Sequence, residues 1–258
     1  MTTEHAKEAS PRPEIGVVTL HEVWTCLKAG FHDFRRAPEF GLFFSAFYAL
    51  GGAVLAWIGA GTFIWTLALA LGFPLVAPFA AVGLYEVSRR LEADLPLSWA
   101  QVLGVVWQER SRQLPWVGCM LALIFLFWSF FAHMSVALFL GTSQLGHLSL
   151  EAFLATPDGK LLMMFQIAVG AAVAFLTFGL TAVALPLLVD KEFDFVTAML
   201  ISFQTVSRNR IAMGLWALII AVSLFVAMLP GFLGLLIALP VLGHATWHIY
   251  RRALYHPM

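Results

Sequence analysis

Hydrophobic and polar positions follow a repeating plan along this chain, in which amphipathic segments alternate with long apolar ones. Between Glu39 and Glu86 no charged residue occurs. This uncharged run of roughly 45 residues is about twice the length that one helix needs to cross the apolar core of a bilayer. We therefore interpret it as two membrane spans joined by the small residues Gly59, Ala60 and Gly61.

The same plan continues through the chain and predicts six membrane-spanning helices. Their predicted ranges are 41–58, 63–87, 114–140, 161–189, 211–229 and 232–250. The predicted fold is an all-α membrane protein with a disordered tail at 1–18 and a single six-helix transmembrane domain at 19–258. The composition agrees, because the chain is 60% hydrophobic and 12% charged, whereas soluble domains have about 25% charged residues.

Three amphipathic segments precede the three pairs of spans, at 20–36, 97–112 and 194–209. In each of them apolar residues recur at spacings of three and four, and two arginines stand near the end. We interpret them as elbow helices that lie in the plane of the membrane interface. The chain would then consist of three elbow-plus-hairpin repeats. Such repeats occur in transporters, and the reuse of one stable insertion unit explains them at least as well.

The distribution of basic residues predicts the orientation of the chain. With six spans, 14 of the 15 Lys and Arg residues lie on the side of both termini, and Lys160 alone lies on the other. The positive-inside rule therefore places both termini in the cytoplasm. The arginine clusters also predict contact with the anionic head groups of membrane lipids. Nucleic-acid binding is not needed to explain them.

Two polar residues lie inside the predicted third and fourth spans. His133 and Gln166 are each several residues from the end opposite the termini. At a rise of 1.5 Å per residue, both lie roughly 9–12 Å below that surface. A polar side chain in lipid needs a partner, so we expect a hydrogen bond across the helix pair. A substrate or proton path is the alternative.

A second polar group is predicted at the cytoplasmic ends of the second and sixth spans. His244 and His248 are one helical turn apart, and Glu86 stands three residues before Arg89, as His248 does before Arg251. We therefore expect Glu86 to meet the two histidines. The one-turn spacing suits metal ligation, but no further ligand at matched depth is evident. We expect no metal and no cofactor.

Sequence motifs for catalysis are absent from the chain. It carries no Walker loop, GxSxG, GxGxxG or HExxH pattern. Its two cysteines, Cys26 and Cys119, have no spacing that suggests a disulfide framework, a zinc site or haem attachment. We therefore expect no catalytic residues and a protein that is not an enzyme.

Four blocks of the sequence resemble a known family. They lie at 27–33, 83–90, 185–190 and 240–252, and they look like a family of predicted proteobacterial integral membrane proteins of unknown function. The resemblance implies a place in the bacterial inner membrane. Some members are labelled as components of cytochrome c oxidase, but this chain lacks the haem–copper ligand pattern. That label implies at most an accessory role beside a respiratory complex, and no functional residue can be carried over.

Two functions remain open at this point. The first is a non-catalytic protein that packs against other membrane proteins, such as respiratory complexes. The second is a small transporter or channel, which the prolines Pro74 and Pro78 inside a span and the intramembrane His133 favour. A continuous polar cavity from His133 to Glu86 would indicate transport, and a filled interior would indicate packing.

Overall fold

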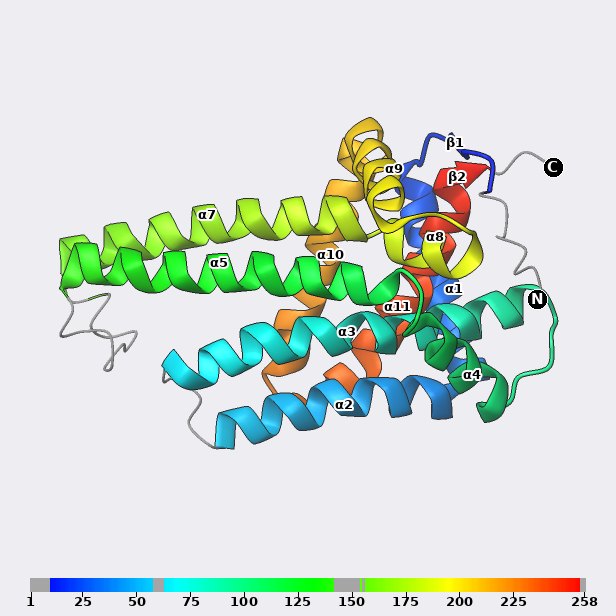
Figure 1. Cartoon of the computed structure of the whole chain (residues 1–258), viewed down its shortest axis with the longest axis horizontal. Helices are drawn as coiled ribbons and strands as arrows, with labels where there is room; N and C mark the ends of the chain where they lie inside the picture. Colours follow the sequence, from blue (N-terminus) through cyan, green and yellow to red (C-terminus); the bar gives the residue numbers. More distant parts are fainter. Residues whose placement is uncertain (1–9, 58–62, 142–153, 155, 256–258) are drawn as a thin grey trace, which may run out of the picture.

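A computed structural model of the chain describes residues 10–57, 63–141, 154 and 156–255, except for the side chains of 55, 56 and 63–76. The predicted turn at 59–61 lies outside the described residues. Within them the structure is almost entirely helical (Figure 1). Its elements are β1 (Glu14–Ile15), α1 (Leu20–Arg36), α2 (Pro38–Trp57), α3 (Phe63–Glu92), α4 (Trp99–Glu109), α5 (Leu114–Leu140), α7 (Pro157–Thr181), α8 (Ala184–Asp190), α9 (Phe195–Arg208), α10 (Arg210–Met228), α11 (Leu235–Ala253) and β2 (Leu254–Tyr255).

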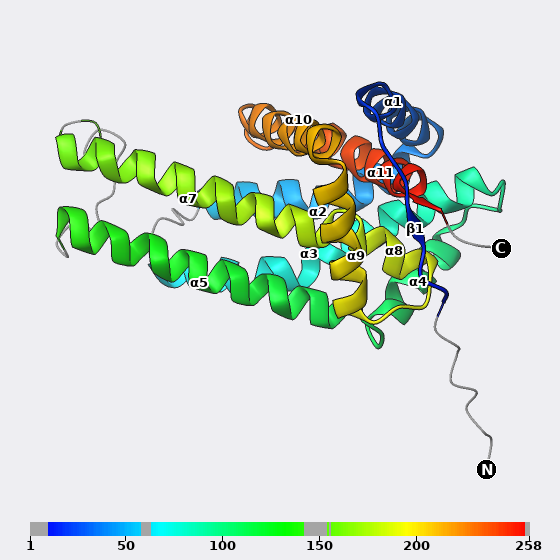
Figure 2. The ribbon, with the colours of Figure 1, turned by 90° about the horizontal axis from the view of Figure 1, so that it is seen from above.

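The helices form two layers that cross each other. The long helices α2, α3, α5 and α7 run side by side along the long axis of the molecule (Figure 1). Helices α1, α10 and α11 pass behind them in that view and form the second layer, which Figure 2 shows from above. The sequence predicts a bundle of six spans, but it does not predict that α10 and α11 cross the other four steeply.

Within the described residues, three helical segments are long and apolar enough to cross a membrane. They are Leu114–Leu140, Pro157–Asp190 and Arg210–Met228. A fourth arises if α1 and α2 are counted as one bent span. The predicted number of six is therefore not confirmed. Helix α11 is not counted as a span because its second half carries two histidines and two arginines. Helix α3 includes side chains that the structure does not describe.

The predicted elbow segments contain the helices α1, α4 and α9. Helix α1 starts with a capping box, in which the side chain of Thr19 and that of Glu22 each accept the backbone N–H of the other residue. It ends at Ala37, and α2 leaves at an angle of 102°. Pro38 opens α2, because proline fits the first helical position but cannot continue a preceding helix.

Each elbow helix leaves an apolar stripe exposed. Neighbouring residues of each stripe are three, four or seven positions apart along the helix, so each stripe occupies one face. They consist of Leu20, Trp24 and Phe31 in α1, Trp99, Leu103 and Trp107 in α4, and Val196, Leu200 and Phe203 in α9. Amphipathic helices are thus confirmed in these segments, whereas the threefold repeat of the whole unit is not.

Residues 10–18, which we call the N-terminal strap, are ordered. Strand β1 pairs antiparallel with β2, and the Val18 N–H donates to Asn209 Oδ1 at 2.7 Å. Asn209 Nδ2 donates in turn to the Gly16 carbonyl. The expectation of a disordered tail at 1–18 is wrong for this part, because its backbone groups find partners on the helices.

Helices α1 and α11 pack closely against each other. A Cβ atom added at Gly30 would lie 2.4 Å from the backbone nitrogen of Ala245 and 2.6 Å from the carbonyl oxygen of Val241. Only glycine permits this approach of two backbones. Trp247 and Tyr250, further along α11, are also fully buried. Helix α11 is therefore held firmly at the charged end of the molecule.

Candidate functional site

The charged ends of several helices meet around the last turns of α11. Trp247 Nε1 donates to Glu92 Oε2 of α3 at 2.8 Å, and the Tyr250 hydroxyl donates to Asp190 Oδ2 of α8 at 2.7 Å. Arg251 bonds Glu92 at 3.1 Å and lies 3.6 Å from Asp190. The C-terminal turns of α11 thus bind acidic residues from two other helices.

A buried hydrogen-bonded chain adds α1 to this group. Asp33 Oδ2 accepts the Ser88 hydroxyl of α3 at 2.9 Å and His248 Nε2 of α11 at 2.8 Å. Ser88 Oγ lies 2.8 Å from His244 Nδ1. Ser88 and His244 are fully buried and Asp33 is nearly so. We call the chain His248–Asp33–Ser88–His244, together with the contacts of Glu92 and Asp190, the polar hub.

The hydrogen-bond pattern fixes the tautomer of His244. A serine hydroxyl has one proton, and Ser88 donates it to Asp33. His244 Nδ1 must therefore carry the proton that lies between its ring and Ser88 Oγ. Its other nitrogen, Nε2, is then an acceptor, and among the described residues this buried atom has no hydrogen-bond partner.

The carboxylate of Asp33 is stabilised in its charged form. Burial by itself raises the pKa of Asp33, but the hydrogen bonds from His248 and Ser88 and the nearby imidazoles outweigh this effect and hold the pKa below its usual range. Asp33 belongs to α1, which is not a candidate span on its own. It is therefore a charged anchor between α1, α3 and α11.

The predicted contact between Glu86 and His248 is wrong. Arg89 and Arg90 of the same helix each donate to the Glu86 carboxylate through Nε at 2.7 Å, and His248 bonds Asp33 instead. The distance from the arginines correctly indicated the level along α3, but it did not determine the helix face. Ser88, turned about 200° from Glu86 around the helix, is the residue that faces α11.

Sequence reasoning missed Asp33, although a signal for it exists. Val23, Cys26 and Gly30 are buried on one face of α1, and Asp33 continues their spacing of three and four residues. A charged residue in a buried register needs a partner, because an unpaired buried charge is costly. The register of α1 therefore points to Asp33 as a residue that another helix must bind.

The expected hydrogen bond between the two helices exists, but Gln166 forms it with residues other than His133. Gln166 Nε2 of α7 donates to the Ala132 carbonyl and to Ser135 Oγ of α5, both at 3.1 Å. His133 Nδ1 lies 2.7 Å from the Ser129 carbonyl of its own helix. Gln166 thus joins α5 to α7 beside His133.

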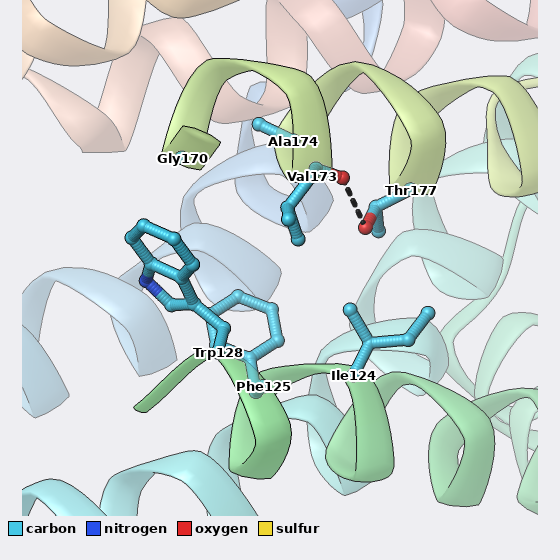
Figure 3. A pocket seen from close by; sticks show the side chains of 7 residues that line it. All are labelled: Ile124, Phe125, Trp128, Gly170, Val173, Ala174 and Thr177. Atoms are coloured by element: carbon cyan, nitrogen blue, oxygen red, sulfur yellow. Dashed lines mark hydrogen bonds between the residues drawn. The ribbon is translucent and has the colours of Figure 1, made fainter. Parts of the chain in front are cut away.

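An apolar cleft of about 280 Å³ lies between α5 and α7 (Figure 3). The Thr177 hydroxyl donates to the Val173 carbonyl of its own helix at 2.8 Å, so this polar group is satisfied. The cleft is lined by Ile124, Phe125, Trp128, Gly170, Val173, Ala174 and Thr177. Neither His133 nor Glu86 borders it. The cleft therefore suits an apolar occupant.

The described residues contain no group of three or more His, Cys, Asp or Glu side chains that could hold a metal ion. The hub is therefore a hydrogen-bonded assembly of side chains. Its contacts join α1, α3, α8 and α11, as the distances above show.

Comparison with known families finds one match. Residues 66–190 match the family described as "Predicted integral membrane protein (DUF2189)". The blocks at 83–90 and 185–190 lie inside this match, whereas those at 27–33 and 240–252 lie outside it. No curated protein and no solved structure matches the chain. Residues 66–190, just under half of the chain, are therefore similar to the DUF2189 family of predicted integral membrane proteins.

Proposed function

We propose that this integral membrane protein is a non-catalytic protein of the bacterial inner membrane that packs against other membrane proteins. The proposal rests on the hydrogen bonds and ion pairs that the charged side chains form within the chain. Asp33, Glu86, Glu92, Asp190 and His248 are all bonded to other residues of the chain. These groups stabilise the arrangement of the helices, and the long helices present apolar surface.

We further propose six spans, made by α2, α3, α5, α7, α10 and α11, with both termini in the cytoplasm. The arginine-rich ends of the helices would then lie at the cytoplasmic surface. The exposed stripes of α1, α4 and α9 would dip into the acyl region, while the nearby arginines contact anionic lipid head groups. Helices α10 and α11 would be tilted against the other four, since the two layers cross (Figure 1).

The cleft between α5 and α7 supports a packing role. Gly170 and Ala174 are small residues four positions apart on its wall, and small residues allow another helix to approach closely. The proposed occupant is a transmembrane helix of a partner protein. Respiratory complexes are the first candidates for that partner, because of the resemblance to labelled oxidase components.

Site-specific photo-crosslinking in the membrane tests this proposal. A photoreactive amino acid at position 174 should capture one discrete protein, while the same group at Ala172, on the opposite side of α7, should not. Ala174→Phe should fill the cleft and abolish the complex after mild solubilisation, and Ala172→Phe should leave it intact. Crosslinks from position 174 to lipid alone would contradict the proposal.

A second candidate function, proton transport, has one specific observation in its favour. The chain His248–Asp33–Ser88–His244 is continuous, and it ends in the buried acceptor His244 Nε2. A proton path needs such connected groups. Proteoliposomes with a pH-sensitive dye inside would show proton uptake that His244→Ala abolishes. Uptake no faster than in empty liposomes would exclude this function.

A further inference from the structure

A pocket of about 330 Å³ opens between α1 and the end of α11. Figure 2 shows these two elements next to each other. The pocket borders the polar hub through His248 and Glu92. Arg251, Arg252 and Tyr255 supply further polar groups, and Thr25, Cys26 and Ala29 form the wall on α1. We call it the α1–α11 pocket.

The acidic groups in and around this pocket already have partners. Glu92 accepts hydrogen bonds from Trp247 and Arg251. Asp33 accepts from Ser88 and His248. Each carboxylate is thus neutralised or bonded within the chain.

Glu22 is another acid near the pocket, and its carboxylate is bonded to the backbone N–H and hydroxyl of Thr19. The charge of Arg252 helps to hold the pKa of Glu22 below its usual range, after the stronger effect of the bonds to Thr19. Arg252 is thus near an acid that is already engaged.

The basic groups are left with binding capacity. Within the described residues Arg252 forms no hydrogen bond to a carboxylate, and its side chain is exposed. Arg251 is already paired with Glu92 and with Asp190 of α8, so Arg252 is the arginine of the lining whose N–H donors stay available to a ligand. The guanidinium group offers a planar set of N–H donors that matches phosphate oxygens. The hydroxyl of Tyr255 can donate a further hydrogen bond.

The position of α1 sets the level of the pocket relative to lipid. Leu20, Trp24 and Phe31 form its exposed apolar face. Thr25 and Ala29 lie roughly 100–160° around the helix from that face, on the side of the pocket. When the apolar face lies in the acyl region, the opposite side of an interfacial helix lies at the level of the head groups.

We infer that the α1–α11 pocket binds the phosphate group of an anionic membrane lipid, with Arg252 as its main ligand. This inference rests on the membrane placement proposed above. The guanidinium of Arg252, which forms no hydrogen bond to a carboxylate among the described residues, favours an anionic lipid over a zwitterionic one. Arg251 and Tyr255 complete the donor set, and the exposed stripe of α1 lies beside the acyl chains of the bound lipid.

Lipid retention by the full-length protein tests the inference. The protein is exchanged into detergent that contains dioleoyl phosphatidylglycerol or dioleoyl phosphatidylcholine, and bound lipid is counted by native mass spectrometry. Phosphatidylglycerol should be retained in preference to phosphatidylcholine. Arg252→Gln should weaken retention about tenfold, as expected for the loss of one charge-assisted hydrogen bond. Arg252→Lys, which keeps the charge, should restore part of it.

Lys160→Gln is the matched control, because it removes the same unit of positive charge and Lys160 is exposed in the first turn of α7, outside the pocket and outside the proposed cytoplasmic arginine clusters. It should retain phosphatidylglycerol like the unmodified chain. Equal losses in both variants, or none in Arg252→Gln, would overturn the inference. So would inorganic phosphate or glycerol phosphate that displaces the lipid at equal concentration, since the pocket would then take a free anion. Carbonate extraction of the same variants separately reports whether the chain is integral to the membrane.

Discussion

Replacement of Asp33 by asparagine tests whether the polar hub holds α1 against α3 and α11. Asparagine has nearly the same size and can still accept hydrogen bonds from Ser88 and His248. The two bonds, at 2.9 Å and 2.8 Å, lose the negative charge that strengthens them. A bond to a charged group contributes about 1.5–3 kcal/mol and a neutral one about 0.5–1.5. The expected loss is therefore about 1 kcal/mol per bond, or about 2 kcal/mol in the free energy of unfolding.

The assay is reversible unfolding of the purified protein in mixed micelles, followed by tryptophan fluorescence. Asp94→Asn is the matched control. Asp94 is exposed in the turn after α3 and has a φ of 49°, which asparagine also tolerates. The control should change the free energy of unfolding by less than about 0.5 kcal/mol. If Asp33→Asn changed the free energy of unfolding as little as the control does, the hub would not stabilise the position of α1.

The same variant makes a prediction about pH. Because the folded-state pKa of Asp33 lies below its unfolded value, its contribution to stability is fully present above about pH 4. It is lost as the pH falls through the lowered pKa. The difference in stability between the unmodified chain and Asp33→Asn should therefore shrink in acid. A difference that stays constant down to pH 2 would refute the reasoning.

Four further substitutions test or control for other contacts. Gly30→Ala should destabilise the protein by about 1–3 kcal/mol, because the new methyl group meets the backbone of α11. Gly104→Ala, in a helical position with no atom within 4 Å, should instead be neutral or stabilise by up to about 1 kcal/mol. Asn209→Ala should release the N-terminal strap, seen as faster hydrogen exchange at 10–18 with unchanged exchange in α5. Gln166→Leu should weaken the α5–α7 contact by about 0.6–1.7 kcal/mol, and a larger loss in the unfolding assay would indicate another role for Gln166.

The sequence predicts the helices well because their signals are local. The uncharged run after Glu39 and the apolar spacing from Leu20 depend only on neighbouring residues, and both segments are helical. The sharp turn between α1 and α2 also has a local cause, because Pro38 stands at the first position of α2. The crossing of the two layers depends on which helix faces meet, and a uniform apolar surface carries little information about this.

The candidate site was predicted only in part, for a related reason. The level of Glu86 and His248 follows from the arginines near them, but their partners follow from the rotation of each helix. A shift from Glu86 to Ser88 changes the face that meets α11. The strap was missed because its order comes from Asn209 and β2, more than 190 residues away.

In the proposed topology the polar hub lies at the cytoplasmic surface and the α10–α11 turn lies at the opposite one. Thiol labelling tests it directly, with Cys26 and Cys119 replaced by serine and one new cysteine at Asp94 or at Leu233, both in exposed positions. In spheroplasts, a membrane-impermeant maleimide should label Leu233→Cys, and Asp94→Cys only after the membrane is opened. Labelling of Asp94→Cys from outside, or protection of Leu233→Cys until the membrane is opened, would contradict the account.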